Sequence, residues 1–280
     1  MTAMSNTRAL TVAAGAKTNR AKRMPFLLQV TTMAWRSLRV AFRTPAEIIP
    51  SLVISVFFLV VYQASLGNAS SFLPGLTGKS YLGFILPISI VSAALSSSSA
   101  AGSSIVRDIE NGYFDKLSLT PASRGALILG PMVAGAAIVV LQTLLVTSVG
   151  VLMGLRPETG VGGILIMIGY ALMLGMAFAG LTVGVALRSG SAAAVQGASF
   201  LFFPLTFLTA TFVPIDLLSG WIKIAATYNP ITYVLDAMRA LMLTGWEADM
   251  LVRGLTSCLA LAVVTYTFAF LGLRARTRRK

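Results

Sequence analysis

The sequence has 280 residues, of which 56% are hydrophobic and only 11% are charged, and its mean hydropathy is +0.83. A soluble domain carries about 25% charged residues, so this composition excludes a soluble globular protein and indicates an integral membrane protein. The excess of 22 Lys and Arg over 9 Asp and Glu therefore indicates the cytosolic face of a membrane rather than nucleic-acid binding.

The N-terminal segment 1–24 is basic and is predicted to be a disordered cytosolic tail. It is not predicted to be a cleaved signal peptide, because no long apolar segment follows it directly. Residues 25–45 predict an amphipathic helix, with Arg36, Arg39 and Arg43 close together around its axis and apolar residues opposite. Such a helix lies flat on the inner leaflet. An N-terminal extension of the first span is the alternative, and Pro45 argues against it.

Six apolar stretches then follow within a transmembrane domain at 46–273. Each is long enough to cross a hydrocarbon core of about 30 Å, which needs roughly 20 apolar residues. The predicted spans are about 48–66, 81–106, 126–154, 161–187, 192–215 and 251–273. Residues 274–280 form a basic tail.

The distribution of basic residues orients these spans. An even number of spans puts both chain ends on one side, together with the segment 107–125 and Arg188. That side holds 17 of the 22 basic residues. Both termini and the segment 107–125 are therefore predicted to be cytosolic.

The segment 107–125 carries three acids and three bases between two long apolar stretches. Gly112 and Pro121 enclose about two helical turns, in which the apolar side chains are Phe114, Leu117 and Leu119. A solvated connector is the ordinary interpretation of such a charged segment. The apolar residues favour instead a short helix that docks into a groove of another protein, with Thr120 or Ser123 capping the next helix. Asp108, Glu110 and Asp115 are candidates for ion pairs with that protein.

The external segment 216–250 is too apolar for a free loop, and Asn229-Pro230 interrupts it. Two short re-entrant helices fit it best. A seventh span over 231–246 is the alternative. That span would place Asp236 and Arg239 in lipid, and inserting each charged residue would cost about 2.5–3.5 kcal/mol, so we reject it.

Several chemistries are missing from the sequence. It has no His, which excludes Ser-His-Asp and Cys-His catalysis and His-ligated metal sites. The spans hold essentially no ionisable residue at mid-depth, which argues against ion-coupled carriers and pumps.

The stretch 75–80 ends like a phosphate-binding loop, but Leu73 replaces the required first glycine. The serine-rich stretch 92–104 favours helix packing over a polar path. No catalytic, metal or cofactor-binding residue is predicted in this chain.

Two blocks of residues resemble the signature of ABC-2 type exporter permeases, most closely the drug-resistance and nodulation (DrrB/NodJ-like) branch. The first block is Glu110, Gly112, Asp115, Leu117, Thr120, Pro121 and Arg124, followed by Leu127 and Gly130. The second block is Pro214, Trp221, Asn229, Pro230, Tyr233, Asp236 and Arg239. Tyr113 departs from the pattern, because many members have Thr or Ser there.

The resemblance implies an all-α membrane fold of the type V exporter kind: an interface helix, six spans, a coupling helix between spans 2 and 3, and a re-entrant pair before span 6. It implies that the first block, with Phe114, is the coupling helix and that the second block is an external gate.

The resemblance also implies a bacterial inner-membrane exporter of a drug, lipid or glycolipid. Two permeases, identical or paralogous, would work with two cytosolic ATPase subunits that bind ATP and Mg²⁺. The permease itself would not be an enzyme. The alternative is a self-contained secondary carrier or a membrane lipid-modifying enzyme, which would act without ATP.

Overall fold

The computed structural model describes residues 24–67, 80–120, 122–209, 215 and 218–278. Most of the predicted tails (1–23 and 279–280), Pro121 and Pro214 lie outside these residues. The described residues form helices and contain no strand. The helices are α2 (Phe26–Arg43), α3 (Pro45–Leu66), α4 (Tyr81–Glu110), α5 (Tyr113–Ser118), α6 (Arg124–Leu152), α7 (Gly160–Ser189), α8 (Ala192–Phe207), α9 (Gly220–Tyr228), α10 (Pro230–Leu243) and α11 (Ala248–Arg278).

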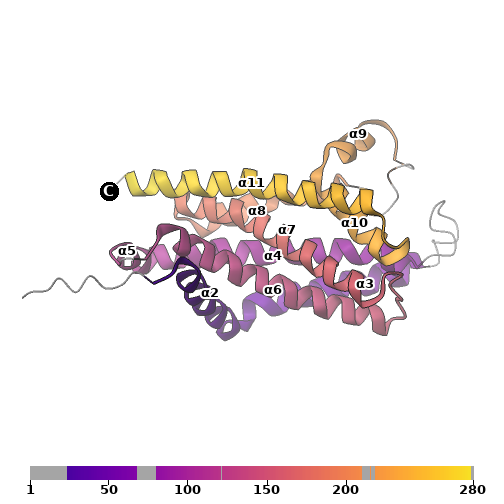
Figure 1. The fold of residues 1–280 in the computed structure, drawn as a ribbon, viewed down its shortest axis with the longest axis horizontal. Coiled ribbons are helices and arrows are strands. Elements are labelled where there is room, and N and C mark those ends of the chain that lie inside the picture. The colour runs from indigo at the N-terminus through magenta and orange to yellow at the C-terminus, as the bar shows by residue number, and fades with distance from the viewer. Residues whose placement is uncertain (1–23, 68–79, 121, 210–214, 216–217, 279–280) are drawn as a thin grey trace, which may run out of the picture.

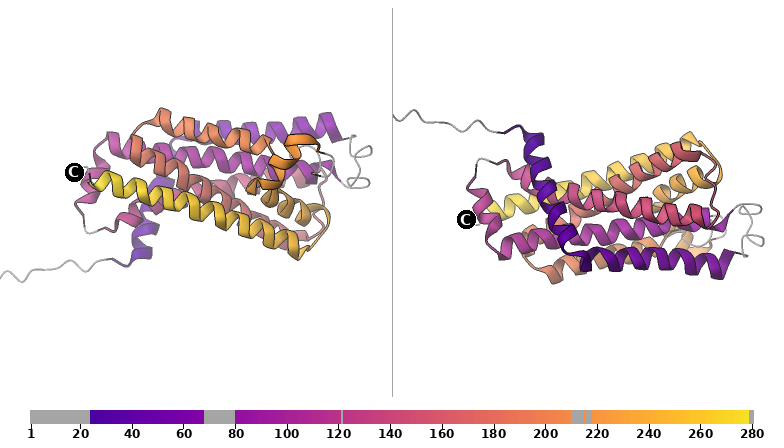
Figure 2. Two further views of the ribbon diagram at one scale, coloured as in Figure 1. Left: turned by 90° about the horizontal axis from the view of Figure 1, so that it is seen from above. Right: turned by 90° about the horizontal axis from the view of Figure 1, so that it is seen from below.

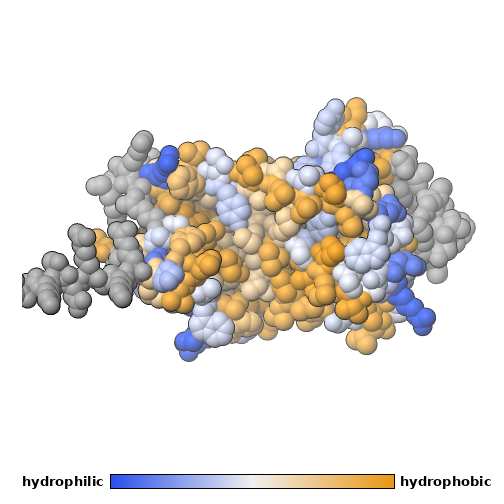
Figure 3. Space-filling view, in the orientation of Figure 1, coloured by the Kyte–Doolittle hydropathy of each residue, from blue (hydrophilic) through white to orange (hydrophobic). Residues whose placement is uncertain are grey.

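Five of these helices, α3, α4, α6, α7 and α11, are long and apolar enough to cross a membrane. They run along one axis, and an apolar band covers the middle of the molecule between more polar ends (Figure 3). A band of this kind is what hydrocarbon solvates. The predicted all-α membrane fold is confirmed.

Helices α4 and α7 form the centre of the bundle (Figures 1 and 2). Helix α7 contacts α11, α4 and α6, and α4 also contacts α3 and α8. In the most apolar segment of α4, 72% of the residues are buried inside the chain, whereas in that of α3 only 17% are buried. Helix α3 therefore presents most of its apolar surface to the surroundings of the chain.

The two ends of the bundle hold different short helices (Figure 1). One end, called the α5 end, holds α2, α5 and the last described residues of α11. The other, called the α10 end, holds α9, α10 and the turn between α6 and α7. The hydroxyl of Thr159 in that turn donates to the Leu241 carbonyl on α10 at 2.6 Å.

Helix boundaries differ from the predicted spans most clearly in α4, α8 and α11. Helix α11 continues to Arg278, five residues beyond the predicted span 251–273 and into the predicted tail 274–280. Helix α4 continues past Val106 to Glu110, because no helix-breaking residue occurs before Gly112. Helix α8 ends at Phe207, three residues after Pro204. Its 16 residues extend over about 24 Å at 1.5 Å per residue, so α8 is shorter than the predicted span 192–215.

A short series of hydrogen bonds joins three of the long helices, α3, α4 and α6. The Gln142 amide on α6 donates to the Ser51 hydroxyl on α3 at 2.8 Å. The Ser97 hydroxyl on α4 donates to the Gln142 carbonyl oxygen at 3.1 Å. Gln142 and Ser97 are almost fully buried. These bonds satisfy an amide that would be costly to bury alone.

Candidate functional site

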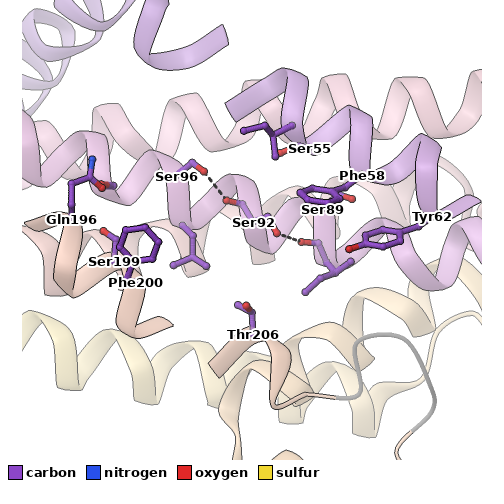
Figure 4. Close-up of a pocket in the computed structure, with 14 residues that line it drawn as sticks. Ser55, Phe58, Tyr62, Ser89, Ser92, Ser96, Gln196, Ser199, Phe200 and Thr206 are labelled. Carbon is purple, nitrogen blue, oxygen red and sulfur yellow. Dashed lines mark hydrogen bonds between the residues drawn. The ribbon is translucent and has the colours of Figure 1, made fainter. Parts of the chain in front are cut away.

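A cavity of about 300 Å³ lies between α3, α4 and α8 (Figure 4). All three helices contribute side chains to it, and the labelled ones face a common space. Its lining residues are Ile54, Ser55, Phe58, Tyr62, Ile88, Ser89, Ser92, Leu95, Ser96, Ser99, Gln196, Ser199, Phe200 and Thr206. None of them is acidic or basic. The volume is at the lower end of the range for small-molecule sites, about 300–1,000 Å³.

The polar groups of the cavity are neutral hydroxyls and one amide. The Ser92 and Ser96 hydroxyls donate to carbonyls of their own helix, at 2.9 and 3.1 Å. The Ser99 hydroxyl donates to Gln196 on α8 at 2.9 Å. The buried hydroxyl of Ser89 has no hydrogen-bond partner among the described residues. Each hydroxyl oxygen remains able to accept a hydrogen bond from a bound molecule.

Aromatic side chains form the apolar part of the lining. The Phe58 and Tyr62 rings stack with centroids 5.5 Å apart and planes 13° apart. Phe58 and Phe200 are also exposed on the outside of the chain, so the cavity is open between α3 and α8. Stacked rings beside neutral hydroxyls suit an uncharged or amphipathic molecule with flat apolar parts.

The predicted coupling residues lie at the α5 end, where the chain leaves α4 and enters the short helix α5. Gly112 has φ +66°, a conformation that a side chain disfavours, and it joins α4 to α5. Phe114 is buried and belongs to the same apolar core cluster as Ile105 on α4 and Ile128 on α6. Leu119, directly after α5, is 88% exposed. The exposed apolar side chain of this segment is therefore Leu119 rather than Phe114.

Helix α2 contacts the segment on both sides of α5. The Arg36 guanidinium donates to the Asp108 carboxylate near the end of α4 and lies 4.3 Å from the centroid of the Tyr113 ring. The Gln29 side-chain oxygen accepts from the Ser123 amide at 2.7 Å. Asp108 and Arg36 are thus bonded within the chain, whereas Asp108 was expected to face another protein.

The predicted external-gate residues separate into a buried and an exposed group at the α10 end. Asn229 is buried and caps α10 by accepting from the Ile231 amide at 3.0 Å, while its own amide donates to the Leu205 carbonyl on α8 at 2.6 Å. Trp221 is exposed on α9. Tyr233 donates to the Thr227 carbonyl at 2.7 Å, and Pro230 is the first residue of α10.

Arg239 is the one residue of that group with a buried charge. Its Nε donates to the Phe84 carbonyl on α4 at 3.0 Å, and its guanidinium lies 3.7 Å from the centroid of the Phe84 ring. Asp236 accepts from it at 3.3 Å. Burial lowers the pKa of Arg239 to about 10, and the Asp236 carboxylate opposes that shift. The guanidinium therefore remains charged at neutral pH.

The structure distributes the predicted site residues over both ends of the bundle. Glu110 and Thr120 are exposed at the α5 end, beside half-buried Asp115 and Leu117, and Arg124 begins α6. On α2, Arg39 and Arg43 are exposed, whereas Arg36 turns inward to Asp108.

Sequence reasoning did not identify the cavity. Its signal is present, since Ser92, Ser96 and Ser99 recur at intervals of four and three residues, which places them on one helical face. Phe58 and Tyr62 on α3 share the same four-residue spacing.

Comparison with known proteins assigns the fold to a family. A family model described as ABC-2 type transporter matches residues 28–243. The probable doxorubicin resistance ABC transporter permease protein DrrC of Mycobacterium tuberculosis is 26% identical over 220 residues, which cover 79% of each chain. The daunorubicin resistance ABC transporter permease protein DrrB1 of Streptomyces coeruleorubidus is 26% identical over 216 residues, covering 75% of this chain and 74% of that protein. Since the family model matches well over half of the sequence, this chain belongs to the ABC-2 type transporter family.

Proposed function

We propose that this chain is the transmembrane permease subunit of an ATP-binding-cassette exporter in a bacterial cell membrane. It would move a hydrophobic or amphipathic molecule with energy from ATP and Mg²⁺ bound by two separate cytosolic ATPase subunits. A second copy or a paralogue would complete the transmembrane part. Family membership and the drug-resistance permeases among the relatives support this proposal.

The observation that carries the proposal is the exposed segment at the α5 end. Leu119 is 88% exposed, and Glu110 and Lys116 are exposed on the same segment of chain. An exposed large apolar side chain on a segment with exposed charges fits an interface with an apolar centre and a polar rim. The excess of basic residues toward both chain ends supports a cytosolic position for the α5 end, where ATPase subunits would bind.

The cavity between α3, α4 and α8 is the proposed binding site for the exported molecule. It combines an uncharged lining with stacked aromatic rings, which favours hydrophobic or amphipathic cargo such as a drug or a lipid. Its opening between α3 and α8 faces the surroundings of the chain, so cargo dissolved in the bilayer could enter without crossing water.

Co-expression with the ATP-binding-cassette ATPase encoded nearest to the gene tests the proposed function. We expect the two chains to copurify and the permease to stimulate ATP hydrolysis in liposomes. Failure of both would contradict the proposal. Transport by the purified permease alone, without ATP, would indicate a self-contained carrier instead.

Replacing Leu119 with Asp is expected to weaken ATPase binding roughly thirtyfold, because a hot-spot residue at the centre of an interface contributes about 2 kcal/mol. Stability should not change, since the side chain is exposed. Binding is measured by titrating labelled ATPase onto the permease in nanodiscs. Leu152→Asp is the matched control, because Leu152 is 87% exposed at the opposite end of the bundle. Equal affinity in the two variants would remove Leu119 from the interface.

Replacing Ser96 with Trp is expected to obstruct the cavity with a bulky ring and to abolish export while leaving ATPase binding intact. Ser148→Trp is the control, because both serines are exposed and donate to the carbonyl four residues earlier. Ser148 does not line the cavity. Cellular accumulation of doxorubicin and of the neutral dye Nile red measures export. Unchanged export in the Ser96 variant would exclude this cavity as the cargo site.

A further inference from the structure

Helix α2 has an inner and an outer face. Its inner face packs on the bundle through the buried residues Val30, Ala34 and Ser37. Its outer face carries Trp35, Arg39, Phe42 and Arg43, all of which are exposed. This set of four residues is called the outer face of α2. It combines two guanidinium groups with two aromatic rings and contains no acid.

The positive charge of the outer face is not neutralised within the described part of the chain. The third arginine of α2, Arg36, bonds to Asp108. Arg39 and Arg43 have no carboxylate partner among the described residues. The Arg39 guanidinium lies 5.6 Å from the centroid of the Trp35 ring, and a contact with a ring face does not use up the N–H donors of a guanidinium.

The position of α2 places its outer face at the boundary of the bilayer. The helix crosses the long axis of the bundle at the α5 end (Figure 2, right). Thr44 alone separates it from α3, whose apolar span begins at Ile48. Arg43 is therefore within about two helical turns of the hydrocarbon region, at the depth of lipid phosphates. Exposed Trp and Phe side chains are favourable at that depth.

We propose that the outer face of α2 binds the headgroups of anionic phospholipids in the adjacent leaflet. Arg39 and Arg43, one turn apart, each match a phosphate with a fork of N–H donors. Trp35 and Phe42 enter the boundary between headgroups and acyl chains. This site differs from the export cavity and does not depend on the cargo or on the ATPase.

The test measures which lipids contact Trp35 in nanodiscs that contain the full chain. The variant W221F/W246F leaves Trp35 as the only Trp, and both replaced residues are exposed at the α10 end. Brominated acyl chains quench Trp fluorescence on contact. The same mole fraction of brominated lipid is supplied either as phosphatidylglycerol or as phosphatidylcholine, in discs of otherwise equal composition.

We expect brominated phosphatidylglycerol to quench Trp35 with a higher apparent affinity than brominated phosphatidylcholine does. The difference should be about fivefold for each arginine that binds a headgroup. Adding R39Q and R43Q should make the two brominated lipids equivalent. Arg253→Gln is the control and should leave the preference intact, because Arg253 lies on α11, near its start at the α10 end, and pairs with Asp249. Protection of the buried Cys258 thiol reports that each variant is folded.

Three outcomes would overturn the proposal. Equal quenching by the two brominated lipids in the parent variant would show that the face does not select anionic headgroups. A preference that survives R39Q and R43Q would assign the selection to other residues. Absence of quenching by either lipid would show that protein, such as a second copy of the chain, covers Trp35.

Discussion

Replacing Arg239 with Ala is expected to destabilise the protein by about 3–5 kcal/mol, the usual cost of breaking a buried ion pair on one side. The guanidinium is 7% exposed and bonds both the Phe84 carbonyl on α4 and Asp236 on its own helix. Its contact with the Phe84 ring is lost as well. The apolar side chains of α10 stay packed in the main core, so the substitution should loosen the contact between α10 and α4 without releasing the helix.

The single cysteine supplies the measurement for this variant. Cys258 is buried in the main core cluster, so its reaction with a thiol-reactive dye during heating reports unfolding. We expect the midpoint of the Arg239→Ala variant to fall by roughly 6 °C or more. Arg239→Lys should fall by less, because it keeps the charge but not the fork of donors. Arg253→Ala, which removes an exposed pair, should change little. A midpoint equal to that of the parent protein would refute the role given to Arg239.

Replacing Gly130 with Val is expected to displace α2 from the bundle and to uncouple transport from ATP hydrolysis. Gly130 on α6 lies against the backbone of α2. An added Cβ would overlap the Met33 side chain and come within 3.1 Å of the Met33 carbonyl carbon. Because backbone atoms must move, the variant should be destabilised by about 1–3 kcal/mol or more. Displacement of α2 would also break the contacts of Arg36 and Gln29 with the segment around α5.

Limited trypsin digestion measures the displacement, because α2 contains three arginines. Cleavage after these residues should accelerate roughly tenfold, since each 1.4 kcal/mol multiplies an opening equilibrium by ten. Gly169→Val on α7 is the control, because an added Cβ there meets no atom within 4 Å. Equal cleavage rates in the two variants, together with normal ATP-driven export, would contradict the prediction.

The long apolar helices could be predicted from sequence because hydrocarbon requires long apolar segments. The predicted spans at 81–106 and 161–187 lie within α4 and α7 for that reason. The end of α8 could not be predicted in the same way. The apolar stretch continues beyond Phe207, and only the contacts of the Asn229 amide with the Leu205 and Leu208 carbonyls show where the helix ends.

The candidate sites were only partly predictable. Charge and apolar residues marked the segment around α5, and Ser123 caps α6 by accepting from Ala126 at 3.3 Å, as one of the two expected caps. Helical periodicity grouped Arg36 with Arg39 and Arg43, yet its acidic partner is 72 residues away. Partners at such separations depend on tertiary packing, which local periodicity does not encode.

The hydrogen bonds of Gln142 limit how α3 can move. This amide joins the Ser51 hydroxyl on α3 to Ser97 on α4, and breaking either bond would leave a buried polar group of Gln142 without its partner. A sliding shift of α3 along its axis would break the bond to Ser51. A swing of α3 about Ser51 would keep it. Because Phe58 and Tyr62 lie two to three turns beyond that pivot, a small swing would widen the cavity most at its aromatic side.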